Sequence, residues 1–165
     1  MIEDEWEKLA QSRNGHNKIV KKLGEIVESR GKKGYPKRVR FTDDLEKELC
    51  IASEHRLKKD KNYVAYKPDL IITLGMDPED RIFIEYVNTK GRNSGNFLRC
   101  LRGMRALECA MKVRGLKAYG FVLALRDSFA KDYMTGVPKS ESILDIMPLA
   151  LLVKRLEGRV PWNFI

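Results

Sequence analysis

The chain has few of the residues that build zinc sites and disulfide frameworks. Its 165 residues include three cysteines and two histidines, and no two cysteines form a Cys-x-x-Cys pair. A structural zinc site is therefore not expected, because it needs several such ligands at short spacings. The scarcity of cysteine also favours a reducing, cytoplasmic location.

Long apolar runs are missing as well. No stretch approaches the roughly 20 apolar residues that cross a bilayer, and the first residues lack the apolar segment of a signal peptide. We therefore expect neither a membrane-spanning nor a secreted protein. A chain of this length is expected to form one domain, residues 1–165, with a hydrophobic core of its own.

Negative charge is in the minority. The chain has 32 lysines and arginines against 23 aspartates and glutamates, and its net charge is +9 at pH 7. An excess of positive charge favours a polyanionic partner such as nucleic acid. Composition alone leaves open the alternative that the lysines only keep the protein soluble.

Hydrophobic periodicity predicts alternating helices and strands. We expect helices over 3–12, 16–30, 43–59 and 96–113, and a last helix from Pro148 to Gly158; strands over 64–74, 81–89 and 118–125; and a loop over 127–140. The basic stretch 32–41 reads as a loop that enters a short strand. This order predicts an α/β fold, a small mixed β-sheet flanked by helices.

Two carboxylates stand inside the most apolar part of the chain. Asp69 precedes Leu-Ile-Ile on one predicted strand, and Glu85 follows Ile-Phe-Ile on the next. If the two strands pair so that Leu74 faces Asp80, then Asp69 faces Glu85, with Cβ atoms about 5 Å apart. Such a pair repels unless a cation lies between the carboxylates. The spacing therefore predicts a divalent metal site.

Pro68-Asp69 on one strand and Glu85 on the next, in this order of elements, resembles the PD-(D/E)xK nuclease superfamily. The resemblance covers roughly residues 15–126 and implies an α-β-β-β-α-β, restriction-endonuclease-like core. The segment 141–165 is then a C-terminal helical extension. The resemblance further implies phosphodiester hydrolysis with Mg²⁺ (or Mn²⁺) held by Asp69, Glu85 and the backbone carbonyl of Tyr86.

The chain departs from the family at the lysine of Glu-x-Lys, where it has Val87. Strand pairing places Lys67 opposite Val87 and on the strand face of Asp69, so Lys67 is the candidate catalytic lysine. Lys90 is the second candidate, although it alternates to the opposite face from Glu85.

Further carboxylates are candidates for the metal site. Members of the family often use a glutamate from the first helix, which Glu25 or Glu28 would supply here. Both lie off the apolar stripe of that helix, so plain surface charge is the competing interpretation. Glu108, within the apolar arc of the 96–113 helix, either pairs with an arginine or joins the metal site.

Positive charge collects on one arc of the 96–113 helix. Arg99, Arg102, Arg105 and Lys112 lie on this arc, next to the loop that carries Lys90 and Arg92. Such a ridge suits contacts with phosphates. We expect nucleic acid, DNA in particular, to bind there, and a solvated helix face is the alternative.

The C-terminal part contains a run that is apolar nearly all round. Residues 143–153, ILDIMPLALLV, predict a buried helix or a dimer contact. Two aromatic residues follow near the terminus. We expect a homodimer through this region.

The leading hypothesis is a metal-dependent DNA endonuclease with structure-specific or weakly sequence-specific cutting, since no recognition domain is appended. The second is an inactive nuclease-fold module that only binds nucleic acid, with Val87 as its signature. The third is an unrelated α/β scaffold whose basic surface contacts RNA or an acidic protein.

Overall fold

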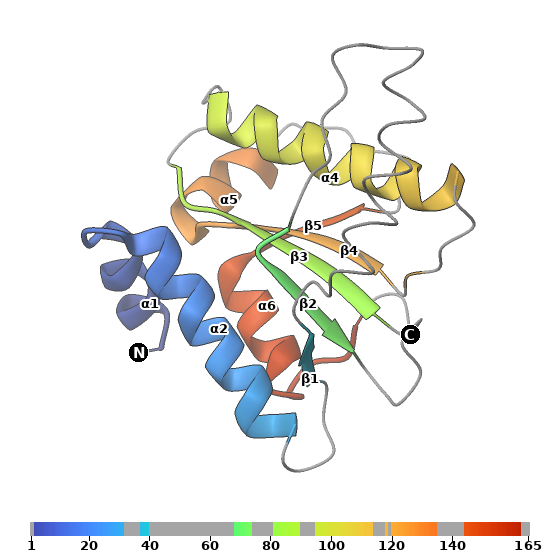
Figure 1. Cartoon of the computed structure of the whole chain (residues 1–165). Coiled ribbons are helices and arrows are strands. Elements are labelled where there is room, and N and C mark those ends of the chain that lie inside the picture. Colours follow the sequence, from blue (N-terminus) through green and yellow to red (C-terminus); the bar gives the residue numbers. More distant parts are fainter. Residues whose placement is uncertain are drawn as a thin grey trace.

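The fold was described from a computed structural model (Figure 1). The structure describes residues 2–31, 37–39, 68–73, 81–89, 95–113, 118, 120–134 and 144–162. The helix predicted over 43–59 lies outside these residues.

A mixed sheet forms the centre of the molecule. Its strands are β1 (Lys37–Val39), β2 (Leu70–Thr73), β3 (Arg81–Val87), β4 (Gly120–Leu125) and β5 (Leu144–Pro148). The strands lie in sequence order, antiparallel from β1 to β3 and parallel from β3 to β5. The predicted small mixed sheet is therefore confirmed.

The register between β2 and β3 is the one predicted from the sequence. Leu70 pairs with Ile84, and Ile72 pairs with Ile82. Asp69 lies immediately before β2, so the same register continued by one position sets it opposite Glu85.

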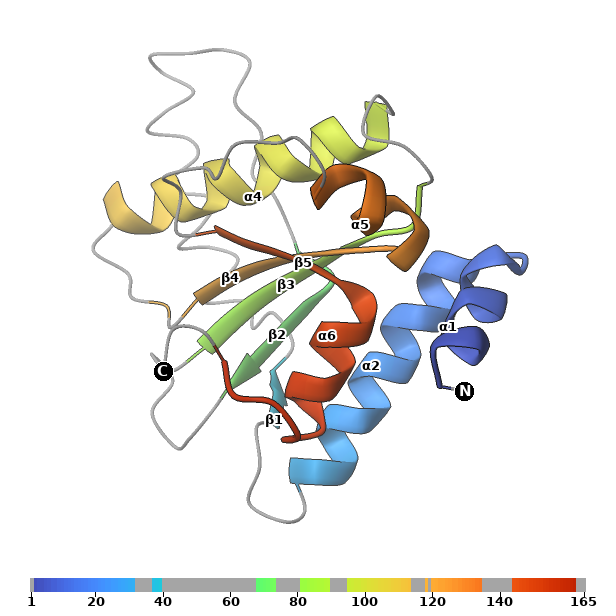
Figure 2. The same cartoon turned by 180° about the vertical axis from the view of Figure 1, so that it is seen from behind.

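Helices cover both faces of the sheet (Figures 1 and 2). They are α1 (Ile2–Gln11), α2 (Gly15–Gly31), α4 (Gly95–Val113), α5 (Asp127–Met134) and α6 (Leu149–Leu156). Helices α1, α2 and α6 share one buried cluster with the sheet, and α4 and α5 share the other. The order from α2 through β4 is α-β-β-β-α-β among the described elements, as predicted.

The two faces arise from strict alternation along β3. Ile82, Ile84 and Tyr86 belong to the cluster with α2 and α6, whereas Phe83 and Val87 belong to the cluster with α4. Successive side chains of a strand point to opposite faces. Glu85 therefore lies on the α4 face of the sheet, where 4% of its surface is exposed.

A tight turn joins α1 to α2 and sets the position of the first residues of α2. Asn14 has a φ of 56°, in the left-handed region. A Cβ on Gly15 would overlap the carbonyl oxygen of Ala10, so only glycine fits this close approach. The turn thereby holds His16 in the first turn of α2.

Two predictions about the C-terminal third were wrong. The predicted loop over 127–140 contains helix α5, which Phe129 and Ala130 anchor in the core. The described part of the predicted helical extension begins instead with strand β5; the last helix, α6, follows Pro148 as its N-cap, as predicted. An apolar run hides its own periodicity, because apolar residues satisfy a buried strand and a buried helix equally well.

The apolar C-terminal residues are buried within the chain itself. Leu144, Met147, Leu149, Leu152 and Val153 are all buried, and Trp162 is 6% exposed. The composition of this segment is thus explained without a dimer contact.

Candidate metal centre

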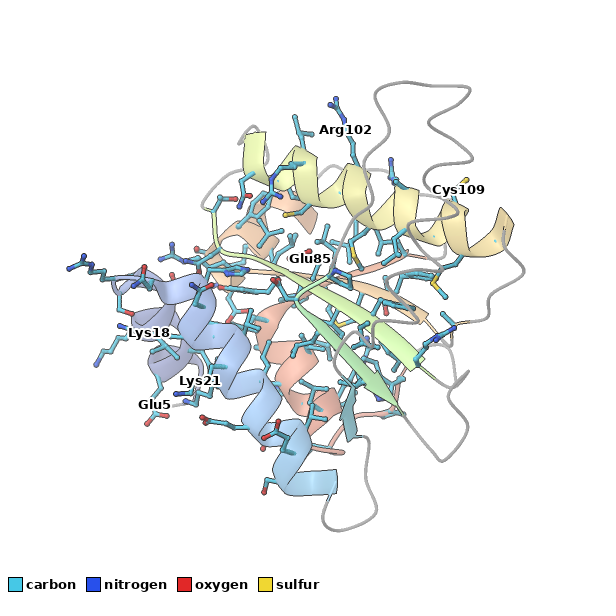
Figure 3. The ribbon with its side chains drawn as sticks, viewed as in Figure 1. Glu5, Lys18, Lys21, Glu85, Arg102 and Cys109 are labelled. Atoms are coloured by element: carbon cyan, nitrogen blue, oxygen red, sulfur yellow. The ribbon has the colours of Figure 1, made fainter. Side chains whose placement is uncertain are left out.

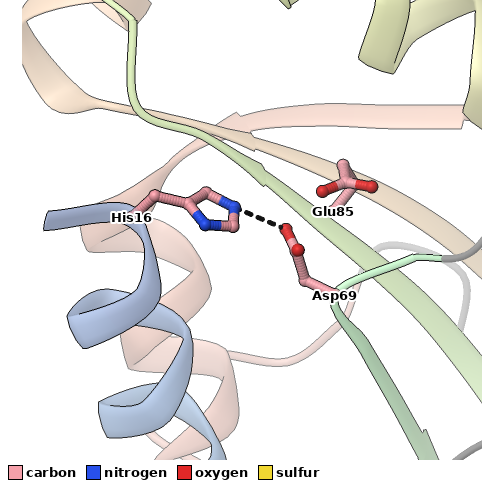
Figure 4. A group of neighbouring side chains, drawn as sticks. All are labelled: His16, Asp69 and Glu85. Carbon is pink, nitrogen blue, oxygen red and sulfur yellow. Dashed lines mark hydrogen bonds and ion pairs between the residues drawn. The ribbon is translucent and has the colours of Figure 1, made fainter. Parts of the chain in front are cut away.

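Three ionisable side chains meet at one end of the hairpin formed by β2 and β3. His16 comes from the start of α2, Asp69 from the residue before β2, and Glu85 from β3 (Figure 4). One ligand atom from each residue lies within 4.8 Å of the other two. The histidine reaches the carboxylates from the opposite helical layer, past the end of β2.

Asp69 is the centre of the hydrogen bonding. Its Oδ2 lies 3.1 Å from Nε2 of His16 and accepts a 2.8 Å hydrogen bond from the backbone N–H of Tyr86. Burial raises the pKa of Asp69, but the hydrogen bonds to His16, Glu85 and the Tyr86 N–H outweigh it, and the net pKa lies below its ordinary value. Asp69 is therefore ionised at neutral pH.

Both ring nitrogens of His16 have oxygen neighbours. Nδ1 lies 3.0 Å from Oδ1 of Asn17, while Nε2 faces Asp69. The hydrogen bond to Asp69 raises the pKa of His16, and burial only partly opposes it. When Nδ1–H donates to Asn17 and the ring is neutral, Nε2 has a free lone pair directed at Asp69. A metal-bound histidine usually has this arrangement, with its second nitrogen held by an oxygen.

The Tyr86 side chain contacts His16 on the α2 face of the sheet, opposite to the face of Glu85. Its ring stacks on His16 with centroids 5.8 Å apart, and its hydroxyl donates to Asn88, which in turn donates to the carbonyl of Ala10. Burial raises the pKa of the Tyr86 phenol, which therefore stays protonated. The backbone of this residue also faces the site, since the N–H and C=O of one strand residue point to the same side. Its carbonyl oxygen therefore lies on the side of Asp69, as a metal ligand there requires.

The carboxylates open into a pocket of about 340 Å³ between the two helical layers. The lining residues are His16, Asp69, Glu85, Tyr86, Asn96, Arg99 and Cys100. The last three come from the first turns of α4. One guanidinium nitrogen of Arg99 donates a 2.7 Å hydrogen bond to Oδ1 of Asn96.

The structure brings Asp69, Glu85 and Tyr86 together, as predicted, but not every candidate joins them. Glu25 is exposed and lines a different hollow with Trp6 and Lys22. It lies nine residues from His16, about 14 Å along the helix. The prediction of Glu25 as a metal ligand was therefore wrong.

The remaining candidates fall into two groups. Arg99, Arg102 and Arg105 are exposed on α4, and Figure 3 shows Arg102 pointing away from the body of the molecule. Glu28 is exposed on α2, and half-buried Glu108 is not part of the cluster. The candidates Lys67, Lys90 and Arg92 lie outside the described residues.

His16 was not predicted as a metal ligand from the sequence. Two local signals point to it: it is one of only two histidines, and it follows directly on the Asn14-Gly15 turn. Its contact with Asp69 spans 53 positions, and no local pattern encodes a contact of that range.

No protein-family model, curated protein or solved structure matches this chain. None of the helices among the described residues is long and apolar enough to cross a membrane.

Proposed function

We propose that the protein is a divalent-metal-dependent endonuclease that hydrolyses phosphodiester bonds in DNA. The observation that carries the proposal is the convergence of His16, Asp69 and Glu85 in one pocket at the end of the β2–β3 hairpin. The α-β-β-β-α-β order and the net charge of +9 support it.

The donor set fits a divalent cation with mixed ligand preference. Two carboxylates supply hard oxygen ligands, which suit Mg²⁺ and Mn²⁺, and the imidazole supplies a nitrogen ligand, which suits transition metals better than Mg²⁺. His16, Asp69 and Glu85 would hold the ion, and the Tyr86 carbonyl faces the same side. We therefore propose Mn²⁺ as the better fit, with Mg²⁺ as the abundant alternative.

A divalent ion held by His16, Asp69 and Glu85 would supply a water of lowered pKa and a positive charge beside the phosphate. The residues of the chain fix that geometry: Asp69 is held by the Tyr86 N–H, His16 by Asn17 and the Tyr86 ring, and Glu85 by its burial. In the reaction, a bond forms between the oxygen of water and phosphorus, and the bond to one bridging oxygen breaks. The water gives up a proton to solvent, and the leaving oxygen takes one from solvent.

The basic face of α4 supports DNA as the substrate. Arg99, Arg102 and Arg105 are exposed on this helix, whose first turns also line the pocket. A strand that contacts this face passes the metal centre, and each contact with a phosphate releases counterions.

An inactive DNA-binding module is the second candidate function. It is favoured by Val87, which is fully buried beneath α4 and carries no charge to the pocket. On this reading the basic face binds DNA and the cluster holds a structural ion or none.

Two further proposals concern the molecule as a whole. The cytoplasm is the proposed location, since neither Cys100 nor Cys109 forms a disulfide. A homodimer through the C-terminal region remains a prediction, and it would use the exposed residues of that region, since most of its apolar side chains are buried.

The test uses supercoiled plasmid and a branched DNA incubated with the full chain and Mn²⁺, Mg²⁺ or EDTA. Glu85→Gln removes one carboxylate without changing its size, and Glu25→Gln makes the same change at an exposed position. We expect metal-dependent nicking that Glu85→Gln abolishes and Glu25→Gln preserves. DNA binding without nicking under every metal condition would refute the endonuclease and favour the binding module.

A further inference from the structure

The pocket contains a cationic side chain on the wall opposite His16. Arg99, one turn into α4, lines the pocket together with Asp69 and Glu85. Val87, the next residue of β3 on the sheet face of Glu85, is fully buried and carries no charge. Among the described residues, Arg99 is thus the permanently charged cation that lines the pocket of the two carboxylates.

We propose that Arg99 binds the phosphate that is cleaved and supplies the positive charge that Val87 cannot. This inference rests on the proposed function and assigns the catalytic cation of the same site to α4. Arg99 is then distinct in role from Arg102 and Arg105, which hold DNA farther along the helix.

The surroundings of Arg99 suit this role. Within the described part of the chain its guanidinium forms no ion pair, and its hydrogen bond goes to the neutral oxygen of Asn96. That bond occupies one Nη2–H and orients the planar group, while the other N–H donors stay available to a phosphate. Arginine remains charged at every accessible pH and donates two parallel hydrogen bonds to phosphate oxygens.

Helix geometry separates Arg99 from its neighbours on α4. Asn96, Arg99 and Cys100 are three and four residues apart, so they lie on one side of the helix, and all three line the pocket. Arg102 does not line the pocket and points away from the body of the molecule (Figure 3). Arg102→Ala is therefore a matched control, since it removes the same charge from the same helix at a different orientation.

The first measurement does not depend on cleavage. Inorganic phosphate is titrated into the Mn²⁺-loaded protein, and broadening of its ³¹P resonance by the bound Mn²⁺ reports phosphate next to the ion. We expect Arg99→Ala to weaken phosphate affinity about tenfold, as loss of a charge-assisted pair would. Mn²⁺ affinity should stay within twofold, and Arg102→Ala should change neither quantity.

The second measurement separates kcat from KM on plasmid DNA. Loss of a preorganised donor to the transition state lowers kcat by about 10²- to 10³-fold, so Arg99→Ala should show that loss. Arg99→Lys should recover part of the loss, whereas Arg102→Ala should raise KM alone.

The outcomes distinguish this inference from the proposed function. If phosphate binding depends on Arg99 but the parent protein does not cleave DNA, the proposed endonuclease is refuted and the phosphate site is supported. Cleavage that Arg99→Ala leaves intact would keep the endonuclease and overturn the role of Arg99. Phosphate that does not bind next to Mn²⁺, or binds equally in Arg99→Ala, would overturn it as well.

Discussion

Two kinds of charged contact are found beside the sheet, and they differ in the number of positive and negative groups that they bring together. Arg126 pairs with Glu7 at 2.7 Å, and Arg155 pairs with Asp145 at 3.1 Å. Each contact joins an arginine to a carboxylate. The cluster at the hairpin instead combines two carboxyl groups with one imidazole, whose charge depends on pH.

The arginine–carboxylate pairs are expected to serve stability, and the hairpin cluster is expected to serve function. Arg126 and Arg155 have side chains only 5% and 4% exposed, so each guanidinium needs its carboxylate to remain buried. The hairpin cluster places two carboxyl groups beside one imidazole, and an added cation would allow both carboxyl groups to be ionised side by side. Sites that break a local rule of stability are the ones where function is expected.

The largest expected effect comes from removing one carboxyl group of the cluster. Glu85→Gln should lower the rate of DNA cleavage by about 100-fold or more, since even partners outside the ligand shell contribute 10- to 100-fold. In EDTA the same substitution should change the free energy of unfolding little, because the glutamine amide can still donate the hydrogen bond that Asp69 accepts from Glu85. Plasmid nicking and urea unfolding of one preparation measure both. A substantial loss of stability with unchanged cleavage would place Glu85 among the structural charges.

A substitution in an arginine–carboxylate pair should lower the stability of the protein and leave metal binding unchanged. Asp145→Ala removes the ion pair with the buried Arg155 and should cost about 2 kcal/mol in the free energy of unfolding, less than a fully buried pair because Asp145 is 21% exposed. Affinity for Mn²⁺ should stay unchanged. Glu157→Ala is the control, because its pair with Arg159 is exposed and should cost less than about 0.5 kcal/mol. Equal costs for the two variants would remove the distinction between buried and exposed pairs.

His16 should set the preference of the centre among metals. His16→Gln should lower the affinity for Mn²⁺ by about tenfold, and that for Mg²⁺ by less, because Mg²⁺ takes oxygen ligands. Calorimetric titration of each ion measures the ratio. Lys21→Ala, at an exposed position of the same helix, should leave both affinities unchanged. A parallel loss for both ions would mean that His16 shapes the site without binding the metal.

The smallest expected effect is an opposite response to pH with and without metal. The pKa of His16 is raised above its ordinary 6.5, so its pair with Asp69 stabilises the metal-free protein below pH 6.5, and this is lost as the pH rises through the raised pKa. The pKa of Asp69 is lowered, so its contribution persists above its ordinary 3.8 and is lost only at more acidic pH.

The expected loss of stability in EDTA between pH 6 and 9 is less than about 1 kcal/mol, because the His16 side chain is 38% exposed. Affinity for Mn²⁺ should rise over the same range, since the ion displaces the proton of His16. Unfolding and calorimetric titrations at four pH values measure the two slopes. Slopes of the same sign, or slopes that persist in His16→Gln, would contradict the assignment.

The acid pair was predictable because a short hairpin has one register. The sequence predicts a polar turn near Asp77, and the apolar strands on either side of it favour the register that sets Asp69 opposite Glu85. The alternation along β3 likewise predicts that Glu85 and Val87 share a face. Helix α4 was predictable from its two arcs, one apolar and one basic.

What the sequence left open depends on long-range packing. The contact of His16 with Asp69 depends on where α2 crosses the sheet, and the α1–α2 turn at Gly15 decides that position. Strand β5 was hidden inside an apolar run that suits a helix equally well. The sequence places Glu25 on a helix but does not show which way its side chain points, and in the structure it points away from the metal centre.

The central claim is that His16, Asp69 and Glu85 form a metal centre, and a calorimetric titration with Mn²⁺ tests it most directly. The parent protein and the double variant Asp69→Asn with Glu85→Gln are titrated in parallel after both are shown to be folded by circular dichroism. The account predicts one Mn²⁺ bound per chain in the parent and no binding in the variant. Equal binding in both proteins, or none in the parent, would contradict it.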